Sequence, residues 1–562
     1  MHRRISFVGN LLLAVSSVAI GQAPPVPLPA NLPVLSAQLQ QRMDKDLLEI
    51  DVRGLQALYA AHKYSIEQVT RWSMGRVARY NGIYRAVQTV DVERALATAR
   101  AEDADRKTSH GALWGVPIVV KANTAVKGLL DTDGWQGFAQ PGHLFIARRD
   151  ATVVAKLRAA GAVIIGITNM PDFAASDTNR SSALGRTGNA YDVRFSPGGS
   201  SGGTVTAVTS NMVVLGTGTD TANSIRMPAG TSSVVGMLPT RGLVSIAGIA
   251  PLDWLRDNTG PITRNVTDAA IALGVMAGED PLDFETIGSA VKAQAAPYTA
   301  YLKKDALKGK RFGVPAFIFT EQEDGLRPET RAMLMQAVAA FRAAGAEVVI
   351  DDSLLPVGFL DGGRKSLTAP YRKDGADRWL AAFGPPQYRT AEQFSAATGI
   401  AWPAVFAGAR PDGAAVSASG ALVGKAPPPP PQVRLADDPQ AEARFFAPRR
   451  ASLAEYVAAL DRLHLDGLIY PSAQMPPPDE TMPQNGELSS GPHSATGWVN
   501  RIGVPAIVVP AGFYPSGLPF GLEISARPWR DGDLLGWAYA FEQATKARRP
   551  PMLVESGLLP KL

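Results

Sequence analysis

Apolar residues recur along this chain at two different intervals, and the change from one to the other predicts helices that alternate with strands. Between residues 36 and 106 they return every three or four positions, as at Leu55 and Leu58, which is the spacing of helices with one buried face. Ser65 is followed three residues later by Gln68, a pairing that predicts a capped helix start. The first part of the globular chain is therefore expected to be largely helical.

Runs of apolar residues without polar alternation come next. They occupy residues 113–121, 162–167 and 212–215, and they predict buried strands. Asp150 is expected to cap the helix between the first two runs, and Gly161 to end it. Because strands of this kind are typical of a sheet that helices cover on both faces, the pattern predicts an α/β fold.

The later part of the chain is less regular. Residues 410–435 are rich in Gly, Ala and Ser and contain five consecutive prolines, which predicts a loop or an extended polyproline segment. Regular structure is expected to resume with a helix at 451–463 and closing strands at 468–470 and 506–509. The intervening residues 476–496 are expected to be irregular and to border a pocket.

Composition narrows the class of protein. The chain has 562 residues, of which 46% are hydrophobic and 19% charged, as in a soluble globular protein with a large core. Its formal net charge is +5 and its basic residues are scattered, so nothing indicates a nucleic-acid partner. There are no cysteines, which excludes disulfides, thiolate metal ligands, a cysteine nucleophile and a lipoprotein anchor.

The N-terminus has the features of an export signal. Arg3 and Arg4 precede an apolar stretch, and a small-x-small cleavage site ends it at Gly21. The alternative, a short membrane anchor, is disfavoured because polar residues and glycine dilute a stretch already too short to span a bilayer. We therefore expect a signal peptide at 1–21, a proline-rich linker at 22–35, and export to a Gram-negative-type periplasm or beyond, without a membrane anchor.

Two serines and one lysine carry the candidate chemistry. Lys121 ends a predicted strand, and Ser200 and Ser224 lie 24 residues apart in glycine-containing segments. A buried strand end can lower the pKa of a lysine, and a serine becomes a nucleophile only when another group takes its proton. Residues 216–224 are expected to form a loop whose backbone N–H groups converge, as an oxyanion hole requires. The combination indicates acyl transfer without histidine.

Each motif also has a plainer interpretation. A lysine at a strand end usually reaches solvent, and a glycine- and serine-rich block is often a linker. Residues 198–202 also satisfy the G-x-S-x-G pattern of the α/β-hydrolases. That motif follows a buried strand and needs a late histidine, whereas residues 189–197 are polar and only His464 and His493 are available. The α/β-hydrolase interpretation is therefore disfavoured.

Taken together, the motifs resemble those of the amidase signature family. Residues 198–203 have the sequence GGSSGG, and residues 218–228 have the sequence GTDTANSIRMP, which matches the family pattern GTDxxxSIRxP. The resemblance extends over residues 40–280 and 465–550. It implies an amidase-signature fold, in which helices sandwich a large, mixed, twisted β-sheet.

The resemblance also implies a domain organisation and a set of site residues. One amidase domain would cover 36–562, with its core at 40–350 and 465–550 and a variable insertion at 355–465. Three side chains would form a Ser-cisSer-Lys triad. Ser224 would be the nucleophile and Lys121 the base. Ser200, which would follow a cis peptide bond, would be the proton relay. The oxyanion hole would consist of the backbone N–H groups of Thr221, Ala222, Asn223 and Ser224. No metal and no organic cofactor is implied.

The implied reaction is hydrolysis of a linear carboxylic amide to an acid and an amine or ammonia through a seryl acyl-enzyme. The substrate would be a small-molecule or peptide amide, and a homodimer is the default expectation. Ser201, Phe173 and Trp254 are candidate substrate-binding residues. Relatives often have Gly-Gly where this chain has Ala222-Asn223, which bears on substrate range. An alkaline pH optimum is expected because the lysine must be neutral to act as a base.

Three alternatives stay open. The same triad could hydrolyse esters or carbamates. The family also includes cytosolic subunits of a tRNA-linked glutamine amidotransferase, which act with partners. A catalytically silent, amidase-like binding protein is the third alternative.

Overall fold

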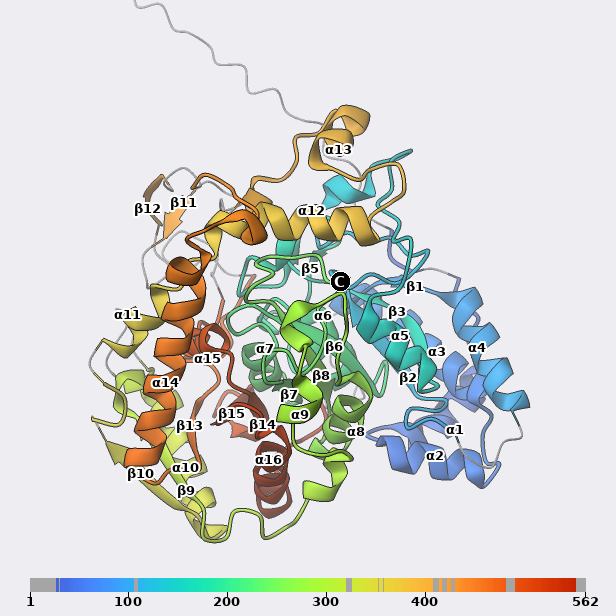
Figure 1. Ribbon diagram of the computed structural model, residues 1–562. Helices are drawn as coiled ribbons and strands as arrows, with labels where there is room; N and C mark the ends of the chain where they lie inside the picture. The colour runs from blue at the N-terminus through green and yellow to red at the C-terminus, as the bar shows by residue number, and fades with distance from the viewer. Residues whose placement is uncertain are drawn as a thin grey trace, which may run out of the picture.

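The computed structural model describes the residues from which the fold follows: 27–29, 31–105, 110–319, 326–351, 353–356, 358–407, 414–416, 422–425, 430–481 and 491–551. Within them, an 11-stranded sheet runs through the molecule, and helices flank it (Figure 1). The sheet is mixed, since four of its neighbouring pairs are parallel and the others antiparallel. This is the α/β architecture that the apolar runs predict.

The strands follow one another across the sheet in the order β1 (Val87–Val90), β3 (Val163–Thr168), β2 (Pro117–Lys121), β6 (Leu215–Asp220), β8 (Asn258–Thr263), β7 (Val235–Leu238), β14 (Ala506–Phe513), β15 (Pro519–Ala526), β13 (Gly467–Pro471), β9 (Arg311–Pro315) and β10 (Glu347–Asp351). Two short pairs stand apart from it, β4 (Arg180–Ser181) with β5 (Gly185–Arg186), and β11 (Ala414–Val416) with β12 (Leu422–Lys425).

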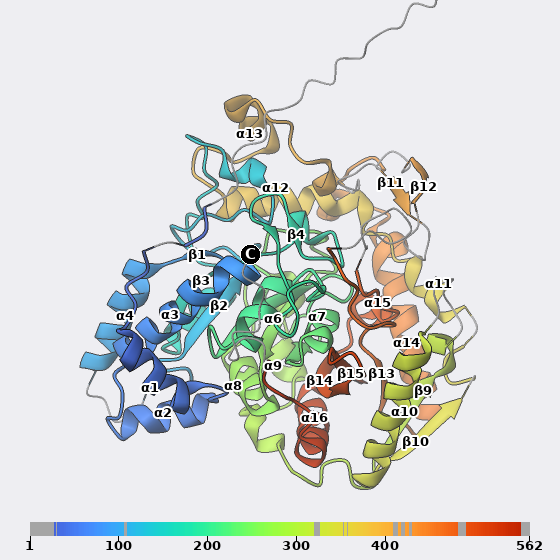
Figure 2. The same ribbon diagram turned by 180° about the vertical axis from the view of Figure 1, so that it is seen from behind.

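In chain order the helices are divided into three groups, and Figure 2, seen from behind, shows α1 to α4 on one side of the molecule and α10, α11 and α14 on the other. The first group is α1 (Ala37–Leu47), α2 (Val52–Ala60), α3 (Ile66–Tyr84), α4 (Val92–Ala104) and α5 (Thr152–Ala159). The second is α6 (Gly202–Thr209), α7 (Arg226–Thr231), α8 (Val266–Met276), α9 (Ser289–Lys292) and α10 (Pro328–Ala343). The third is α11 (Phe359–Arg364), α12 (Arg372–Phe383), α13 (Ala391–Thr398), α14 (Ala447–Arg462), α15 (Gly497–Ile502) and α16 (Asp531–Thr545).

The central strands and two helices of the fold are fully buried and closely packed. Every residue of β2, β3, β6 and β8 is buried, and so is every residue of α6 and α7. A Cβ on Gly203 would lie 2.3 Å from the carbonyl oxygen of Asn169, and one on Gly216 would lie 2.6 Å from Cγ2 of Thr204. Glycine therefore permits α6 to approach the sheet closely, and this brings two motif segments together.

Most of the elements expected from the sequence are present. The capping box of Ser65 and Gln68 starts α3, with both of its hydrogen bonds formed. The run at 113–121 contains β2, the run at 162–167 covers all of β3 except its last residue, and the later expectations correspond to α14, β13 and β14. In both views, α12 and α13 lie at one end of the molecule, over the β4–β5 pair (Figures 1 and 2).

Two local predictions were wrong. Asp150 does not cap α5, whose N-cap is Ala151. Its carboxylate instead accepts the N–H of Lys127 at 2.8 Å and bonds Arg158 at 3.0 Å, so it ties a loop to the helix. The strand expected at 212–215 begins only at Leu215 and continues to Asp220.

Two segments that were expected to be loops contain regular structure. Residues 216–220 pair with β8, and β6 also pairs with β2 on its other side, so backbone hydrogen bonding makes a strand of a sequence without an apolar run. Within 410–435, the strands β11 and β12 form an antiparallel pair, so part of the predicted loop is also regular. Prolines 427–429 lie outside the described residues.

The predicted signal peptide lies outside the described residues, so export stays a prediction. None of the helices in the described part of the chain is long and apolar enough to cross a membrane.

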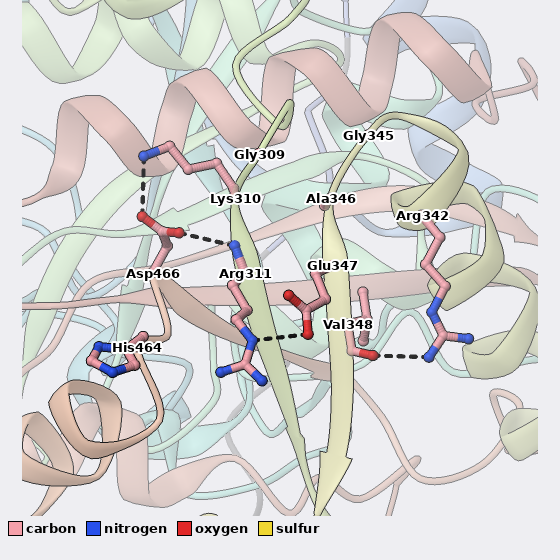
Figure 3. A pocket seen from close by; sticks show the side chains of 10 residues that line it. All are labelled: Gly309, Lys310, Arg311, Arg342, Gly345, Ala346, Glu347, Val348, His464 and Asp466. Carbon is pink, nitrogen blue, oxygen red and sulfur yellow. Dashed lines mark hydrogen bonds and ion pairs between the residues drawn. The ribbon is translucent and has the colours of Figure 1, made fainter.

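A hollow at the edge of the sheet lies where β9 and β10 begin, and several charged side chains line it (Figure 3). Lys310 lies 3.1 Å from Asp466, and Arg311 lies 3.0 Å from Glu347. Arg342 donates to the carbonyl of Val348 at 2.8 Å. These cations have partners within the protein, and the two serine motifs lie elsewhere, around α6, β6 and α7.

Candidate active site

Lys121 is the last residue of β2, and its side chain is fully buried. Its Nζ lies 2.8 Å from Oγ of Ser200 and 2.8 Å from Oγ1 of Thr219. The Nδ2 group of Asn123 donates to the same threonine oxygen at 3.0 Å. The lysine and the first motif serine, 79 positions apart, thus belong to one hydrogen-bond network.

Burial lowers the pKa of Lys121 to about 7, although the carboxyl groups of Asp133, Asp220 and Asp257 oppose the shift. Burial also raises the pKa of Asp133 well above its ordinary value, with Asp131 adding to the effect. A protonated carboxyl group carries no charge to hold a proton on the lysine. Near neutral pH, a large fraction of Lys121 is therefore uncharged and able to accept a proton.

Ser200 lies in the turn before α6, and the Gly199–Ser200 peptide bond is cis, as the resemblance implies. Gly198 has a φ of 78°, in the left-handed region that favours glycine. A Cβ on Gly199 would lie 2.5 Å from the carbonyl oxygen of Thr178. Gly199 therefore lets a neighbouring segment, residues 176–178, pack closely against the backbone just before Ser200.

Ser224 lies in the turn between β6 and α7. Its carbonyl accepts the N–H of Ser201 at 3.2 Å, which holds the two serine motifs side by side. Ser224 is 6% exposed, and its hydroxyl has no hydrogen-bond partner among the described residues. The same part of the structure contains no acceptor for the backbone N–H groups of Ala222, Asn223 and Ser224. The hydroxyl and these donors are left available for a bound molecule.

A buried ion-pair network holds this turn in place. Arg226 lies 3.1 Å from Asp220 and also pairs with Glu523 of β15, and all three side chains are fully buried. Asp220 accepts the N–H of Ile225 at 3.1 Å, and Asn500 donates to the carbonyl of Asp220 at 2.7 Å. Arg226 and Asp220 therefore serve the framework of the turn.

The candidate substrate-binding residues are placed differently from one another. Ser201 adjoins both motif serines and donates to the carbonyl of Thr219 at 3.3 Å, so its polar groups are already engaged. Phe173 packs between the rings of Trp135 and Phe406, at centroid distances of 5.4 and 5.5 Å. Their roles in substrate binding stay predictions.

Trp254, the third candidate, packs under the segment that contains α12. Its indole N–H donates to the carbonyl of Tyr371 at 2.9 Å, and its ring lies 5.7 Å from that of Phe284. A Cβ on Gly375 of α12 would lie 2.3 Å from its ring. These contacts serve packing, and a role toward substrate stays a prediction.

Sequence analysis missed three polar residues at the site. Thr219 was treated only as part of a motif, although it contacts Lys121 directly. Asn123 follows the lysine by two positions, and that proximity was the signal that could have found it. Asp177 accepts a hydrogen bond from Asn223 at 3.4 Å, and no local pattern indicates it.

Comparisons with known proteins identify the family. The family model for Amidase matches residues 68–354 and 437–535, which is more than half of the chain. The chain belongs to the amidase family. It is 31% identical over 535 residues to a glutamyl-tRNA(Gln) amidotransferase subunit from Moorella thermoacetica, covering 90% of this chain and 99% of that protein.

Solved structures give the same fold. A peptide amidase in complex with the competitive inhibitor chymostatin is 30% identical with a TM-score of 0.73, covering 90% of this chain and 99% of that one. A 6-aminohexanoate cyclic dimer hydrolase complexed with substrate is 25% identical with a TM-score of 0.68, covering 90% and 99%. The fold is thus the α/β amidase-signature fold, and the relatives differ in what they act on.

Proposed function

We propose that this protein hydrolyses a linear carboxylic amide through an acyl-enzyme on Ser224, with Lys121 as the base and Ser200 as the proton relay. The observation that carries the proposal is the buried Lys121, whose Nζ lies 2.8 Å from Oγ of Ser200. Its pKa of about 7 provides a neutral amine where a serine proton must go.

In the proposed acylation, Oγ of Ser224 attacks the amide carbon while its proton passes to Ser200, whose own proton passes to Nζ of Lys121. The carbonyl oxygen becomes an oxyanion, and the backbone N–H groups of residues 221–224 stabilise it. The C–N bond then breaks, Ser200 gives its proton to the leaving amine, and Nζ of Lys121 returns a proton to Ser200, which leaves the lysine neutral again. Water repeats the sequence on the acyl-enzyme, releases the acid and restores Ser224.

The relatives support amide chemistry but differ in substrate. Two are described as a peptide amidase and a cyclic dimer hydrolase, and others as amidotransferase subunits. A second candidate function follows from the last group, because this chain aligns with 99% of the length of one such protein. In that case glutamine would be the amide substrate, and a partner protein would receive the ammonia. Glutamine therefore belongs in the first substrate screen beside aryl and peptide amides.

Export is a separate proposal that rests on the N-terminal sequence alone. Expression in a Gram-negative host, followed by mass spectrometry of the periplasmic protein, tests it. A mature protein that begins at residue 22 is expected, and a full-length cytoplasmic protein would contradict export.

The test of the chemistry is labelling with a fluorophosphonate, followed by mass-spectrometric location of the adduct. An adduct on Ser224 that is lost in Lys121→Met and Ser200→Ala is expected, while Ser182→Ala, an exposed serine bonded to Asp172, serves as the control. An adduct on Ser200 would favour the α/β-hydrolase interpretation. No adduct on any serine of folded protein would favour a silent binding protein.

A further inference from the structure

Asp177 lies between the two serine motifs. It belongs to the segment that packs on Gly199, the residue before Ser200, since a Cβ on Gly199 would lie 2.9 Å from the carbonyl carbon of Asp177. Its side chain extends to the second motif, where Oδ1 accepts from Nδ2 of Asn223 at 3.4 Å. Asn223 directly precedes Ser224 in the sequence, so the carboxylate contacts the side chain of the residue before the proposed nucleophile.

The carboxylate of Asp177 is accessible and lacks a permanent counter-ion. Its side chain is 29% exposed, and its Oδ2 lies 3.8 Å from Nδ1 of His493. A histidine supplies a full positive charge only when it is protonated. No lysine or arginine among the described residues forms an ion pair with Asp177. Asp177 is therefore a partly exposed acidic residue that contacts the residue before Ser224.

Asn223, directly before the proposed nucleophile, orients the carboxylate of Asp177 through its side-chain amide. The amide of Asn223 fixes one oxygen of Asp177 and leaves the other toward His493. A fixed carboxylate binds a protonated amine with a charge-assisted hydrogen bond and repels a substrate carboxylate.

We propose that Asp177 forms an acidic subsite beside Ser224 and that the preferred substrates are amides which also carry a protonated amine. The inference rests on the proposed function, because it assigns a substrate class to the same site. Asp177 contacts the substrate in this proposal but takes no part in bond breaking. Its removal therefore discriminates between charged and neutral substrates.

The experiment compares wild type with Asp177→Asn, which removes the charge and keeps the shape. Two matched pairs place the amine at two distances from the scissile carbonyl: L-leucinamide with 4-methylpentanamide, and L-lysinamide with L-norleucinamide. We expect Asp177→Asn to lower kcat/KM by about tenfold or more for the more cationic member of at least one pair. The neutral 4-methylpentanamide should change by less than about twofold. The control is Asp192→Asn, which removes a carboxylate paired with Arg194 elsewhere in the protein. It should leave kcat/KM unchanged for all four amides.

An equal loss for all four amides would mean that Asp177 only supports the loop, and no loss would mean that no amine binds there. Either result overturns the inference and leaves amide hydrolysis intact. The binding of the same amides to Ser224→Ala, with and without Asp177→Asn, is then measured by calorimetry. Because binding needs no turnover, this measurement tests the acidic subsite separately from amide hydrolysis. A charge preference lost with Asp177 supports the subsite even if the amidase proposal fails. Equal binding of the charged and neutral amides, or no binding of any of the amides, overturns the acidic subsite.

Discussion

The ionisation of Lys121 sets the pH at which Ser224 should become reactive. Only the neutral amine accepts a proton, so the rate should rise as pH increases through the pKa of the lysine, which burial lowers from 10.5 to about 7. About nine-tenths of the side chain is then neutral at pH 8, against roughly 0.3% for a lysine with the ordinary value. Burial thus increases the reactive population about 300-fold at that pH.

The assay is the second-order rate constant for fluorophosphonate labelling of Ser224 between pH 5 and 10, which reports on the free enzyme. We expect the rate constant to rise tenfold per pH unit below pH 7 and to reach a plateau from about pH 8. The rise thus lies at lower pH than the alkaline optimum expected from the sequence. Lys121→Met should abolish labelling of Ser224 over the whole pH range. A rate constant that still rises between pH 9 and 10, or one that stays constant down to pH 5, would refute the reasoning.

Three further predictions concern the framework of the site. Thr219→Val deletes the hydroxyl that contacts the lysine and should lower kcat/KM about 10- to 100-fold in amide hydrolysis, and an unchanged value would remove Thr219 from the network. Glu523→Ala takes a carboxylate from the buried Arg226 and should reduce the free energy of unfolding by about 3–5 kcal/mol in urea titrations, and a loss below about 1 kcal/mol would contradict this. Gly199→Ala places a Cβ 2.5 Å from a carbonyl oxygen and should lower the melting temperature or the soluble yield. Its control, Gly82→Ala in α3, meets nothing within 4 Å and should be neutral or slightly stabilising.

The sequence predicts the fold where burial alone decides the structure. β2 and β3 are buried along their whole lengths, so their apolar runs identify them. β6 is equally buried, but its residues after Leu215 are Gly, Thr and Asp, and it is a strand because β2 and β8 bond it on both sides. No local propensity contains that information, because the partners lie far away in the sequence.

The motif residues could be found from sequence, but their supporting contacts could not. GGSSGG and GTDxxxSIRxP point to the two serines, and their order with Lys121 indicates the chemistry. The contact of Lys121 with Thr219 joins residues 98 positions apart, and that of Asn223 with Asp177 joins residues 46 positions apart. Such pairs depend on how loops meet at the ends of strands, which periodicity does not describe.

The ion pair between Arg226 and Glu523 has a consequence for the order of events during synthesis. A ribosome completes Lys121, Ser200 and Ser224 when more than half of the chain is still unmade, yet the turn that carries the nucleophile is anchored by a strand near the C-terminus. A nascent or truncated chain that ends before β15 thus contains every proposed catalytic side chain without the anchor that orders them. Hydrolytic competence should therefore be acquired late, as a property of the finished polypeptide.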